Sequence, residues 1–178
     1  MTPQRRTDTR ARILDTARDL YAEQGYAGTS MAALAGRLGI SKAALYHHFA
    51  AKTEILDALL AEPTAAYEGL VARATDITAE ELLGGVIDVT AGYAALADIL
   101  GGDPSVRSVQ REHTRDRSRE INAALTAALA DGSTDPAVVA RAHAAYAAAK
   151  HGALAADPLT PEVRAALLAA ALRALRPG

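Results

Sequence analysis

Residues 29–52, TSMAALAGRLGISKAALYHHFAAK, constrain the fold of this chain more than any other stretch. Apolar residues recur at helical spacing at Leu34, Ala35 and Leu38, which indicates a short amphipathic helix. A hydroxyl at Thr29 or Ser30 is suited to cap its first turn, because it can accept a hydrogen bond from an unpaired backbone N–H. The helix should end at the glycine at position 39, since glycine takes the left-handed C-cap conformation without a Cβ clash.

A second, very short helix is predicted over residues 42–48, with Ser41 as its cap. Wound at about 100° per residue, it places Leu45 and Phe49 on one side, where they can pack against the first helix. Another side carries small, polar and aromatic side chains: Lys42, Ala43, Tyr46 and His47. Because no large aliphatic residue lies there, this side is predicted to face outward.

An inward apolar pair with an outward lysine, tyrosine and histidine is typical of the recognition helix of a helix-turn-helix motif. The major groove of DNA admits one α-helix, whose N-terminal residues meet the base edges. The small side chains of Ala43 and Ala44 would allow close approach to the duplex. The same pattern also fits two ordinary core helices joined by a glycine turn, so this segment alone leaves both interpretations open.

The wider context resembles a known family. Residues 9–60 are similar along their full length to the N-terminal DNA-binding domain of the TetR family of transcriptional repressors. The matching positions occur in order and at the family's spacing: Ile13, Leu14, Ala17, Leu20, Tyr21, Gly25, Tyr26, Thr29, Ser30, Leu34, Ala35, Gly39, Ile40, Ser41, Leu45, Tyr46, His48, Phe49, Lys52 and Leu56. Departures are mild. At Ala51 the family often has a helix-capping Ser or Asn, whose loss costs the next helix about 1 kcal/mol.

The resemblance implies an all-α fold in two parts. Residues 1–52 would form a three-helix DNA-binding domain with a helix-turn-helix, and residues 53–178 a helical effector-binding and dimerisation domain. The second helix of the motif would read the major groove while flanking side chains hold phosphates. The residues expected at the groove are Lys42, Ala43, Ala44, Tyr46 and His47. The residues expected to hold phosphates are Thr29, Ser30, Ser41, His48 and Lys52.

Charge is distributed unevenly along the chain. Residues 1–52 hold eight Lys/Arg and four Asp/Glu, whereas residues 53–178 hold eleven and seventeen. A basic head and an acidic body fit a domain that neutralises phosphates joined to one that does not contact DNA. Residues 1–8 are predicted to form a flexible arm, from which Arg5 and Arg6, with Arg10 following, can reach phosphates or the minor groove. A solvated tail is the alternative.

Helices with clear starts and ends are predicted along the rest of the chain. The first covers residues 9–24 and ends at Gly25. Another begins at Lys52 and is expected to kink or break near residue 62, since Pro63 removes a backbone donor. Further helices are predicted near residues 79–100, 104–130, 136–156 and 161–176, with a break at residues 84–85 or 92 as an alternative. Thr78 and Glu81 form a capping box, and Asp-Pro or Thr-Pro pairs open the later helices. No stretch alternates as a strand would, so the fold is predicted to be all-α.

The last two predicted helices, over residues 136–156 and 161–176, are rich in alanine, leucine and valine and poor in charge. This apolar share exceeds what one face of a monomer needs, and small residues let helices approach closely. A palindromic operator also requires two heads related by two-fold symmetry. We therefore predict a homodimer in which two helices of each subunit form a four-helix bundle. The alternative is that alanine reflects genomic base composition and these are core helices.

A small organic effector would need a largely apolar pocket with a few polar groups, and helices within residues 79–130 are predicted to form the body that holds it. Polar candidates for lining the pocket are Tyr67, Tyr93, Arg107, Arg111, His113 and Tyr146. For each of them a surface position is the alternative. Residues 111–120 in particular fit a solvated helix face with i,i+4 ion pairs.

Other chemistries find little support in the sequence. There is no cysteine, so disulfides and thiolate metal sites are excluded, and the histidines lack a recognised metal-ligand spacing. We therefore expect neither a metal nor a cofactor. No catalytic triad order, phosphate-binding glycine loop or dinucleotide fingerprint is present, so no enzymatic activity is expected. Without a long apolar run or a signal-peptide pattern, the protein is expected in the cytoplasm.

Together these features predict a ligand-responsive, homodimeric regulator of transcription. We expect a repressor that binds a palindromic double-stranded DNA operator and is released by a small organic effector. An orphan helical interaction protein without operator binding, and a helical enzyme, are the alternatives. The effector, the operator sequence, the regulated genes and the choice between repression and activation do not follow from the sequence.

Overall fold

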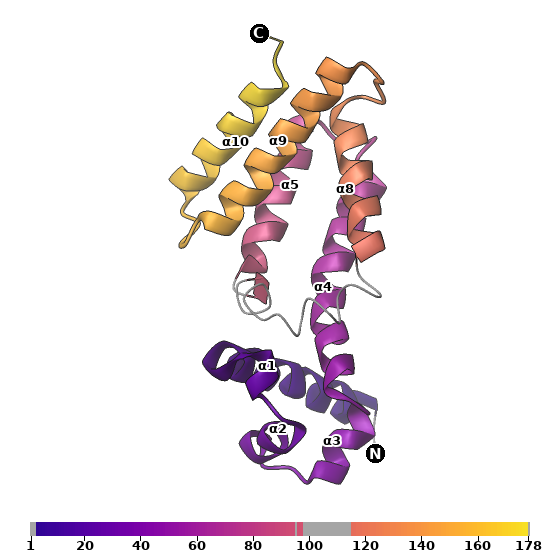
Figure 1. The fold of residues 1–178 in the computed structure, drawn as a ribbon, viewed down its shortest axis with the longest axis vertical. Helices are drawn as coiled ribbons and strands as arrows, with labels where there is room; N and C mark the ends of the chain where they lie inside the picture. Colours follow the sequence, from indigo (N-terminus) through magenta and orange to yellow (C-terminus); the bar gives the residue numbers. More distant parts are fainter. Residues whose placement is uncertain (1–2, 95, 98–114, 178) are drawn as a thin grey trace. The chain divides into compact units, whose positions relative to one another are not determined.

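The structure is a computed structural model that describes residues 3–94, 96–97 and 115–177 (Figure 1). Within these ranges the regular elements are all α-helices, as the sequence predicts. Their bounds are α1 (Pro3–Gly28), α2 (Met31–Leu38), α3 (Lys42–His48), α4 (Lys52–Arg73), α5 (Ala79–Gly92), α8 (Arg115–Leu129), α9 (Pro136–Ala155) and α10 (Pro161–Leu175). Over the same ranges, none of these helices combines the length and the apolar character needed to cross a membrane.

The described residues form two compact units, divided within α4 between Glu62 and Pro63. The first unit contains α1, α2, α3 and the first half of α4, together with residues 96–97. The second contains the rest of α4 with α5, α8, α9 and α10. Each unit has a hydrophobic core of its own.

The first unit packs the inward side of each helix into one core. α1 begins at Pro3, so residues 3–8 continue a helix and do not form the predicted flexible arm. Gly25, at φ 75°, interrupts α1 where the helix was predicted to end. The aromatic rings of Tyr21 and Tyr26 meet edge to face, with their centroids 5.2 Å apart. The buried core residues are Ile13, Ala17, Leu20, Tyr21, Tyr26, Leu34, Ala35, Leu45, Phe49, Ile55, Leu56, Leu59 and Leu96.

α4 continues through Pro63 as one helix. A kink or a break was predicted near residue 62, and the break does not occur. A proline inside a helix costs about 3 kcal/mol or more. Burial of Leu59 and Leu70 on either side of it offsets this cost. The first turn of α4 lacks a capping hydroxyl, but the Glu54 carboxylate accepts the backbone N–H of Ala50 at 2.9 Å.

Side-chain caps define the helix starts of the second unit. Thr78 and Glu81 form the predicted capping box: the Thr78 hydroxyl oxygen accepts the Glu81 N–H at 3.2 Å, and the Glu81 carboxylate accepts the Thr78 N–H at 2.8 Å. Asp135 and Thr160 cap α9 and α10, and each is followed by the predicted proline. Local sequence signals therefore placed these three starts correctly.

The ends of the middle helices agree with the prediction only in part. α5 ends at Gly92, where a break was predicted as the alternative to a helix continuing to residue 100. Glycine is about 1 kcal/mol less favourable than alanine in a helix, and the N–H of Tyr93 bonds to the Thr90 carbonyl at 3.2 Å, which tightens the last turn. α8 ends at Leu129, next to the predicted end at residue 130, and is followed by Asp131 and Gly132 at positive φ. The end predicted near residue 100 and the start predicted near residue 104 lie outside the described residues.

The core of the second unit joins α4, α5, α8, α9 and α10. Its buried residues are Leu70, Leu82, Leu83, Val86, Ile87, Ile121, Leu125, Leu129, Ala130, Ala142, Ala145, Tyr146, Ala149, Ala153 and Ala171. α9 and α10 approach closely at Gly152, where an added Cβ would clash with the side chain of Leu167. α10 fully buries only Ala171, so much of its alanine-rich surface is exposed in the single chain.

Candidate nucleic-acid interface

Two serine caps and one glycine set the geometry of α2 and α3. Ser30 accepts the backbone N–H of Ala33, and Ser41 accepts that of Ala44, each at 3.1 Å. Gly39 lies between the helices in the predicted left-handed conformation, with φ 67°. Because both helix starts and the turn are fixed locally, α3 leaves α2 at a defined angle, as in a helix-turn-helix.

The two sides of α3 differ as the sequence predicts. Leu45 and Phe49 are buried in the core of the first unit, at 0% and 1% exposure. The remaining predicted groove residues are exposed: Lys42, Ala43, Ala44, Tyr46 and His47. Half of the surface of Tyr46 is exposed, which makes it one of the few large hydrophobic residues of the described chain that face solvent.

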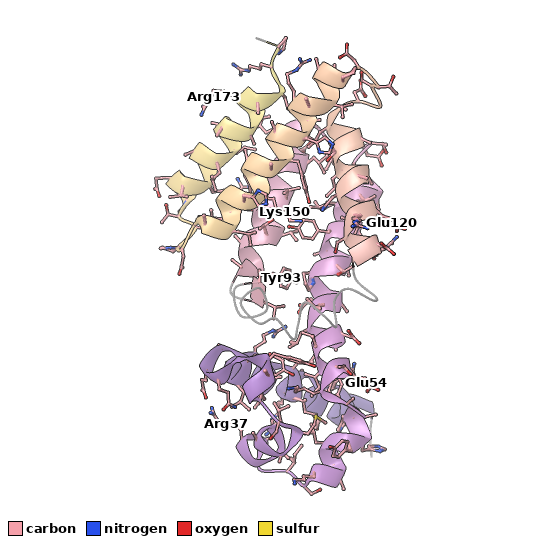
Figure 2. All side chains as sticks on the ribbon, viewed as in Figure 1. Arg37, Glu54, Tyr93, Glu120, Lys150 and Arg173 are labelled. Atoms are coloured by element: carbon pink, nitrogen blue, oxygen red, sulfur yellow. The ribbon has the colours of Figure 1, made fainter. Side chains whose placement is uncertain are left out.

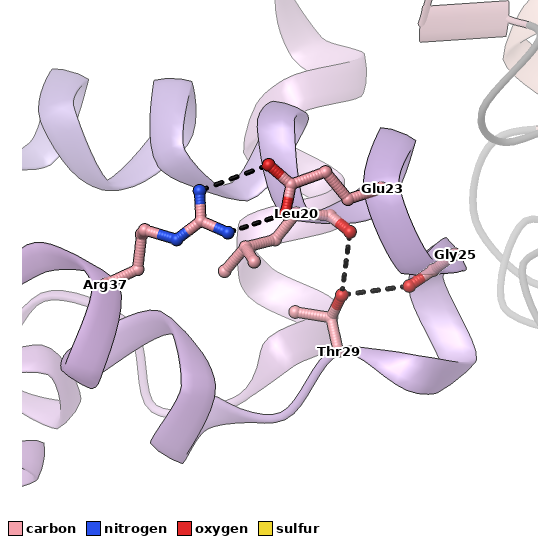
Figure 3. Close-up of polar contacts among 5 residues, drawn as sticks. All are labelled: Leu20, Glu23, Gly25, Thr29 and Arg37. Carbon is pink, nitrogen blue, oxygen red and sulfur yellow. Dashed lines mark hydrogen bonds and ion pairs between the residues drawn. The ribbon is translucent and has the colours of Figure 1, made fainter.

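Lys42 gives this exposed side a positive charge that no described residue neutralises through a hydrogen bond or ion pair. Two arginines of the first unit are instead paired with glutamates. The Arg37 guanidinium pairs with both carboxylate oxygens of Glu23, at 3.1 and 2.5 Å (Figure 3), and Arg18 pairs with Glu62 at 3.0 Å. Hydrogen bonds from Arg37 lower the pKa of the Glu23 carboxyl. An uncompensated cation beside aromatic and small side chains is suited to contact DNA.

Three of the predicted phosphate-binding residues lie at the ends of α2 and α3: Ser30, Ser41 and His48. Ser30 and Ser41 are exposed, and capping uses only their oxygen as an acceptor. Each hydroxyl therefore keeps its hydrogen for donation to a phosphate oxygen. His48 is half-buried at the end of α3, with its ring centroid 5.8 Å from that of His47.

Thr29 does not present its side chain to a phosphate, which corrects the prediction. The residue is buried at 1% exposure. Its hydroxyl lies 3.2 Å from the carbonyl oxygen of Leu20 and 2.9 Å from that of Gly25 (Figure 3). The interruption of α1 at Gly25 breaks the regular ladder of backbone bonds, so carbonyls there need other donors. The Thr29 hydroxyl supplies one.

Lys52 also turns toward the protein. Its Nζ donates to the backbone oxygen of Tyr26 at 2.6 Å and to that of Thr29 at 2.8 Å. The same ammonium lies 4.1 Å from the centroid of the Tyr26 ring. Lys52 therefore holds the corner between α1 and α2, a structural role that the sequence did not indicate. Its predicted phosphate contact stays a prediction.

Arg10, which the sequence placed beyond a flexible arm, contacts the end of α3. Its guanidinium lies 4.2 Å from the centroid of the Phe49 ring and donates to the His48 carbonyl at 3.4 Å. A cation at the C-terminal end of a helix is favourable, because the carbonyls there carry partial negative charge. No spacing in the sequence marks this contact, since it joins residues 38 positions apart.

The second unit brings two of the predicted effector-pocket residues together. Tyr67 and Tyr146 lie beside Lys150, whose Nζ is 5.2 and 5.4 Å from their ring centroids. Tyr93 is half-buried just after α5 (Figure 2). The other three candidates lie outside the described residues: Arg107, Arg111 and His113.

Sequence reasoning missed three partners of these tyrosines. The Tyr146 hydroxyl donates to Asn122 Oδ1 at 2.6 Å, and Tyr67 is hydrogen-bonded to Thr90. Lys150 contacts both Asn122 and Tyr146, each at 3.2 Å. Lys150 could have been identified from the sequence, because it is a single lysine that follows a run of alanines in α9.

Comparisons with known proteins agree with this geometry. The profile of the bacterial regulatory proteins of the tetR family matches residues 13–59. The HTH-type transcriptional regulator UidR of Escherichia coli (strain K12) is 40% identical over 52 residues, which are 29% of this chain and 26% of UidR. The HTH-type transcriptional repressor AcnR of Corynebacterium diphtheriae is 34% identical over 112 residues, which are 60% of this chain and 57% of AcnR.

The alignment therefore spans about a quarter of the length of UidR and a little over half of the length of AcnR. A solved structure extends the similarity over most of the chain. The TetR family transcriptional regulator PfmR from Thermus thermophilus is 31% identical, with 93% of this chain and 100% of that chain covered and a TM-score of 0.57. The chain belongs to the TetR family of bacterial regulatory proteins.

Proposed function

We propose that this protein is a transcriptional repressor that binds a palindromic operator as a homodimer and releases it when a small organic effector binds. The observation that carries the proposal is the outward side of α3. Lys42, Tyr46 and His47 are exposed there, while Leu45 and Phe49 fix the helix from behind. An orphan interaction protein would have no need of a cation and two rings held in this arrangement.

Base edges and phosphates would be contacted by different residues. Lys42, Tyr46 and His47 would meet the major groove, and the exposed alanines between them allow close approach. The hydroxyls of Ser30 and Ser41 would donate to phosphates, together with His48. Lys52 would be a further phosphate contact if its ammonium can serve the backbone and DNA at once. Phosphate contacts set the affinity and its salt dependence, and base contacts set the choice of sequence.

The homodimer would form through α9 and α10. Several alanines on these helices are exposed in the single chain: Ala140, Ala144, Ala155, Ala165, Ala166 and Ala169. Val163 on α10 is also exposed, at 38%. A second copy would cover this surface in a four-helix bundle. It would also present two recognition helices to half-sites about 34 Å apart.

An effector held by the second unit would release DNA by favouring a conformation in which the two heads no longer fit adjacent grooves. It can do so only to the extent that it binds the two conformations with different affinity. The relatives named above are transcriptional regulators, and we propose no enzymatic role. A regulator of this kind acts on DNA in the cytoplasm, where we place the protein.

A salt titration of DNA binding, followed by fluorescence anisotropy, tests the proposal. The probe is the DNA immediately upstream of the gene, compared with random DNA of equal length. Tyr46→Ala and Lys42→Ala are each expected to weaken specific binding by about 1–3 kcal/mol, the usual worth of a good base contact. Arg119→Ala removes a positive charge from the second unit and should leave the affinity unchanged.

Two results would count against the proposal. Wild-type protein that binds the upstream DNA no better than random DNA would contradict a repressor acting at that site. Folded Tyr46→Ala and Lys42→Ala variants with the wild-type affinity would show that α3 does not read the operator.

A further inference from the structure

A part-buried polar cluster lies in the second unit, where α4, α5, α8 and α9 each contribute one or two side chains. Lys150 of α9 is its centre, with Nζ 3.2 Å from Asn122 Oδ1 and 3.2 Å from the Tyr146 hydroxyl. The rings of Tyr67 and Tyr146 stand 5.2 and 5.4 Å from the same nitrogen. Tyr67 is tied to Thr90 of α5. Figure 2 shows Lys150 among the helices of this unit.

The direction of each hydrogen bond in the cluster can be assigned. Thr90 donates its single hydroxyl hydrogen to the Val86 carbonyl at 2.6 Å, so Tyr67 must be the donor to Thr90. Tyr146 donates to Asn122 Oδ1, and its own oxygen accepts from Lys150. The Asn122 oxygen therefore accepts from two donors, which fixes the orientation of its amide.

This assignment leaves a surplus of donors. Lys150 has three N–H groups but only two acceptors among the described residues. The Asn122 amide nitrogen has two N–H groups, and no described residue accepts a hydrogen bond from either. The tyrosine hydroxyls have already used their hydrogens. A ligand that fits the cluster must therefore bring acceptors.

Among the described residues, the cluster also carries no negative charge. No described carboxylate pairs with Lys150, and three carboxylates on the helices that form the cluster pair with arginines instead. Glu68 and Glu120, on α4 and α8, both pair with Arg117 at 2.7 and 2.9 Å. Asp88 on α5 pairs with Arg164 at 2.6 Å. Desolvation lowers the pKa of Lys150, as expected for a part-buried cation that has no counter-ion among the described residues.

We infer that the second unit binds an organic carboxylate, whose carboxylate pairs with Lys150 and the Asn122 amide while its apolar part lies against the rings of Tyr67 and Tyr146. The inference rests on the proposed function, because it names the chemical class of the effector. A monoanion matches the single cation that the described residues of the cluster supply, whereas a phosphate dianion would call for further cations such as a bidentate arginine. An uncharged ligand would leave Lys150 without a counter-ion.

Isothermal titration calorimetry on the full-length protein tests the inference with three acids and their primary amides as matched uncharged controls. The pairs are octanoate and octanamide, benzoate and benzamide, and phenylacetate and phenylacetamide. At least one acid should bind the wild type about tenfold or more tightly than its amide, since a charge-assisted bond is lost in the amide. Lys150→Met should remove that difference, and Arg119→Met, which deletes an exposed cation on α8, should keep it.

Several results would overturn the inference. They are equal binding of acid and amide, undiminished acid binding by a folded Lys150→Met variant, or no binding of any of the three acids. Circular dichroism checks that the variant folds, and Lys150→Gln replaces it if it does not. Anisotropy with the upstream DNA is measured on the same wild-type samples. DNA binding without acid preference would refute only this inference, whereas absent DNA binding would refute the proposed function.

Discussion

Replacing Lys52 by methionine would separate its structural role from its predicted contact with DNA. The change keeps the apolar stem of the side chain and removes the ammonium, with its bonds to the Tyr26 and Thr29 carbonyls at 2.6 and 2.8 Å. Hydrogen bonds with a charged partner contribute about 1.5–3 kcal/mol each, and a cation over an aromatic ring about 0.5–1 kcal/mol. Because the site is part-buried and water can replace some of these contacts, we expect the free energy of unfolding to fall by about 2–4 kcal/mol.

Urea unfolding followed by far-UV circular dichroism measures this loss, and hydrogen exchange of the amides around residues 26–30 assigns it to the corner between α1 and α2. Lys42→Met is the matched control. Lys42 is exposed and has no bonded partner among the described residues, so its replacement should change the free energy of unfolding by no more than about 0.5 kcal/mol. Equal stability of the two variants would refute the structural role of Lys52.

The same pair of variants tests the contact with DNA. A lysine that neutralises a phosphate contributes about one unit to the slope of log affinity against log salt. If the ammonium of Lys52 serves only the backbone, Lys52→Met should leave this slope unchanged under conditions in which the variant is folded. A slope reduced by about one unit would instead show that Lys52 also contacts a phosphate.

Three further predictions follow from single contacts. Thr29→Val should lower the free energy of unfolding by about 1–2 kcal/mol in urea, because the Leu20 and Gly25 carbonyls lose a buried donor; a changed salt slope of DNA binding would contradict its buried placement. Asp135→Ala removes the cap of α9 and should cost about 1 kcal/mol in the same assay, so an unchanged midpoint would argue against the cap. Lys150→Met should be at least as stable as the wild type near pH 7, because burying a cation without a counter-ion is unfavourable. Burial lowers the pKa of Lys150 in the folded protein below 10.5, its ordinary value. Between the folded and the unfolded pKa, the unfolded chain therefore binds more protons than the folded protein. The free energy of unfolding of the wild type should therefore rise relative to that of the variant as the pH increases through this range. Parallel curves of unfolding free energy against pH would contradict this.

The helix-turn-helix could be predicted in detail because its determinants are local. Ser41, the glycine at position 39 and the inward pair Leu45 and Phe49 lie within eleven residues, and each acts on its own turn of helix. The same reasoning placed the starts of α9 and α10. It predicted the end of α5 only as an alternative, because the weak signal at Gly92 competed with an apolar pattern that continues beyond it.

The corrected roles in the first unit depend on contacts that no local pattern encodes. Thr29 and Ser30 are both plausible caps in sequence, and only the interruption of α1 shows that the Thr29 hydroxyl turns inward while Ser30 caps α2. Lys52 and Arg10 reach carbonyls 23 to 38 residues away. A basic residue in a predicted DNA-binding domain is easily assigned to phosphate, although the exposed backbone carbonyls at helix ends are competing acceptors.

Lys150 shows why the candidate effector site could be predicted only in part. The sequence pointed to Tyr67 and Tyr146 as polar side chains in an apolar body, but periodicity cannot show that they face one lysine. A residue chosen for stability alone would be apolar at this position, because the free protein bears the cost of desolvating the ammonium. That cost is already incurred before a ligand arrives, so a carboxylate would meet a cation that is already partly desolvated and held in place. The arrangement that weakens the free protein is therefore the one that would let it distinguish an acid from its amide.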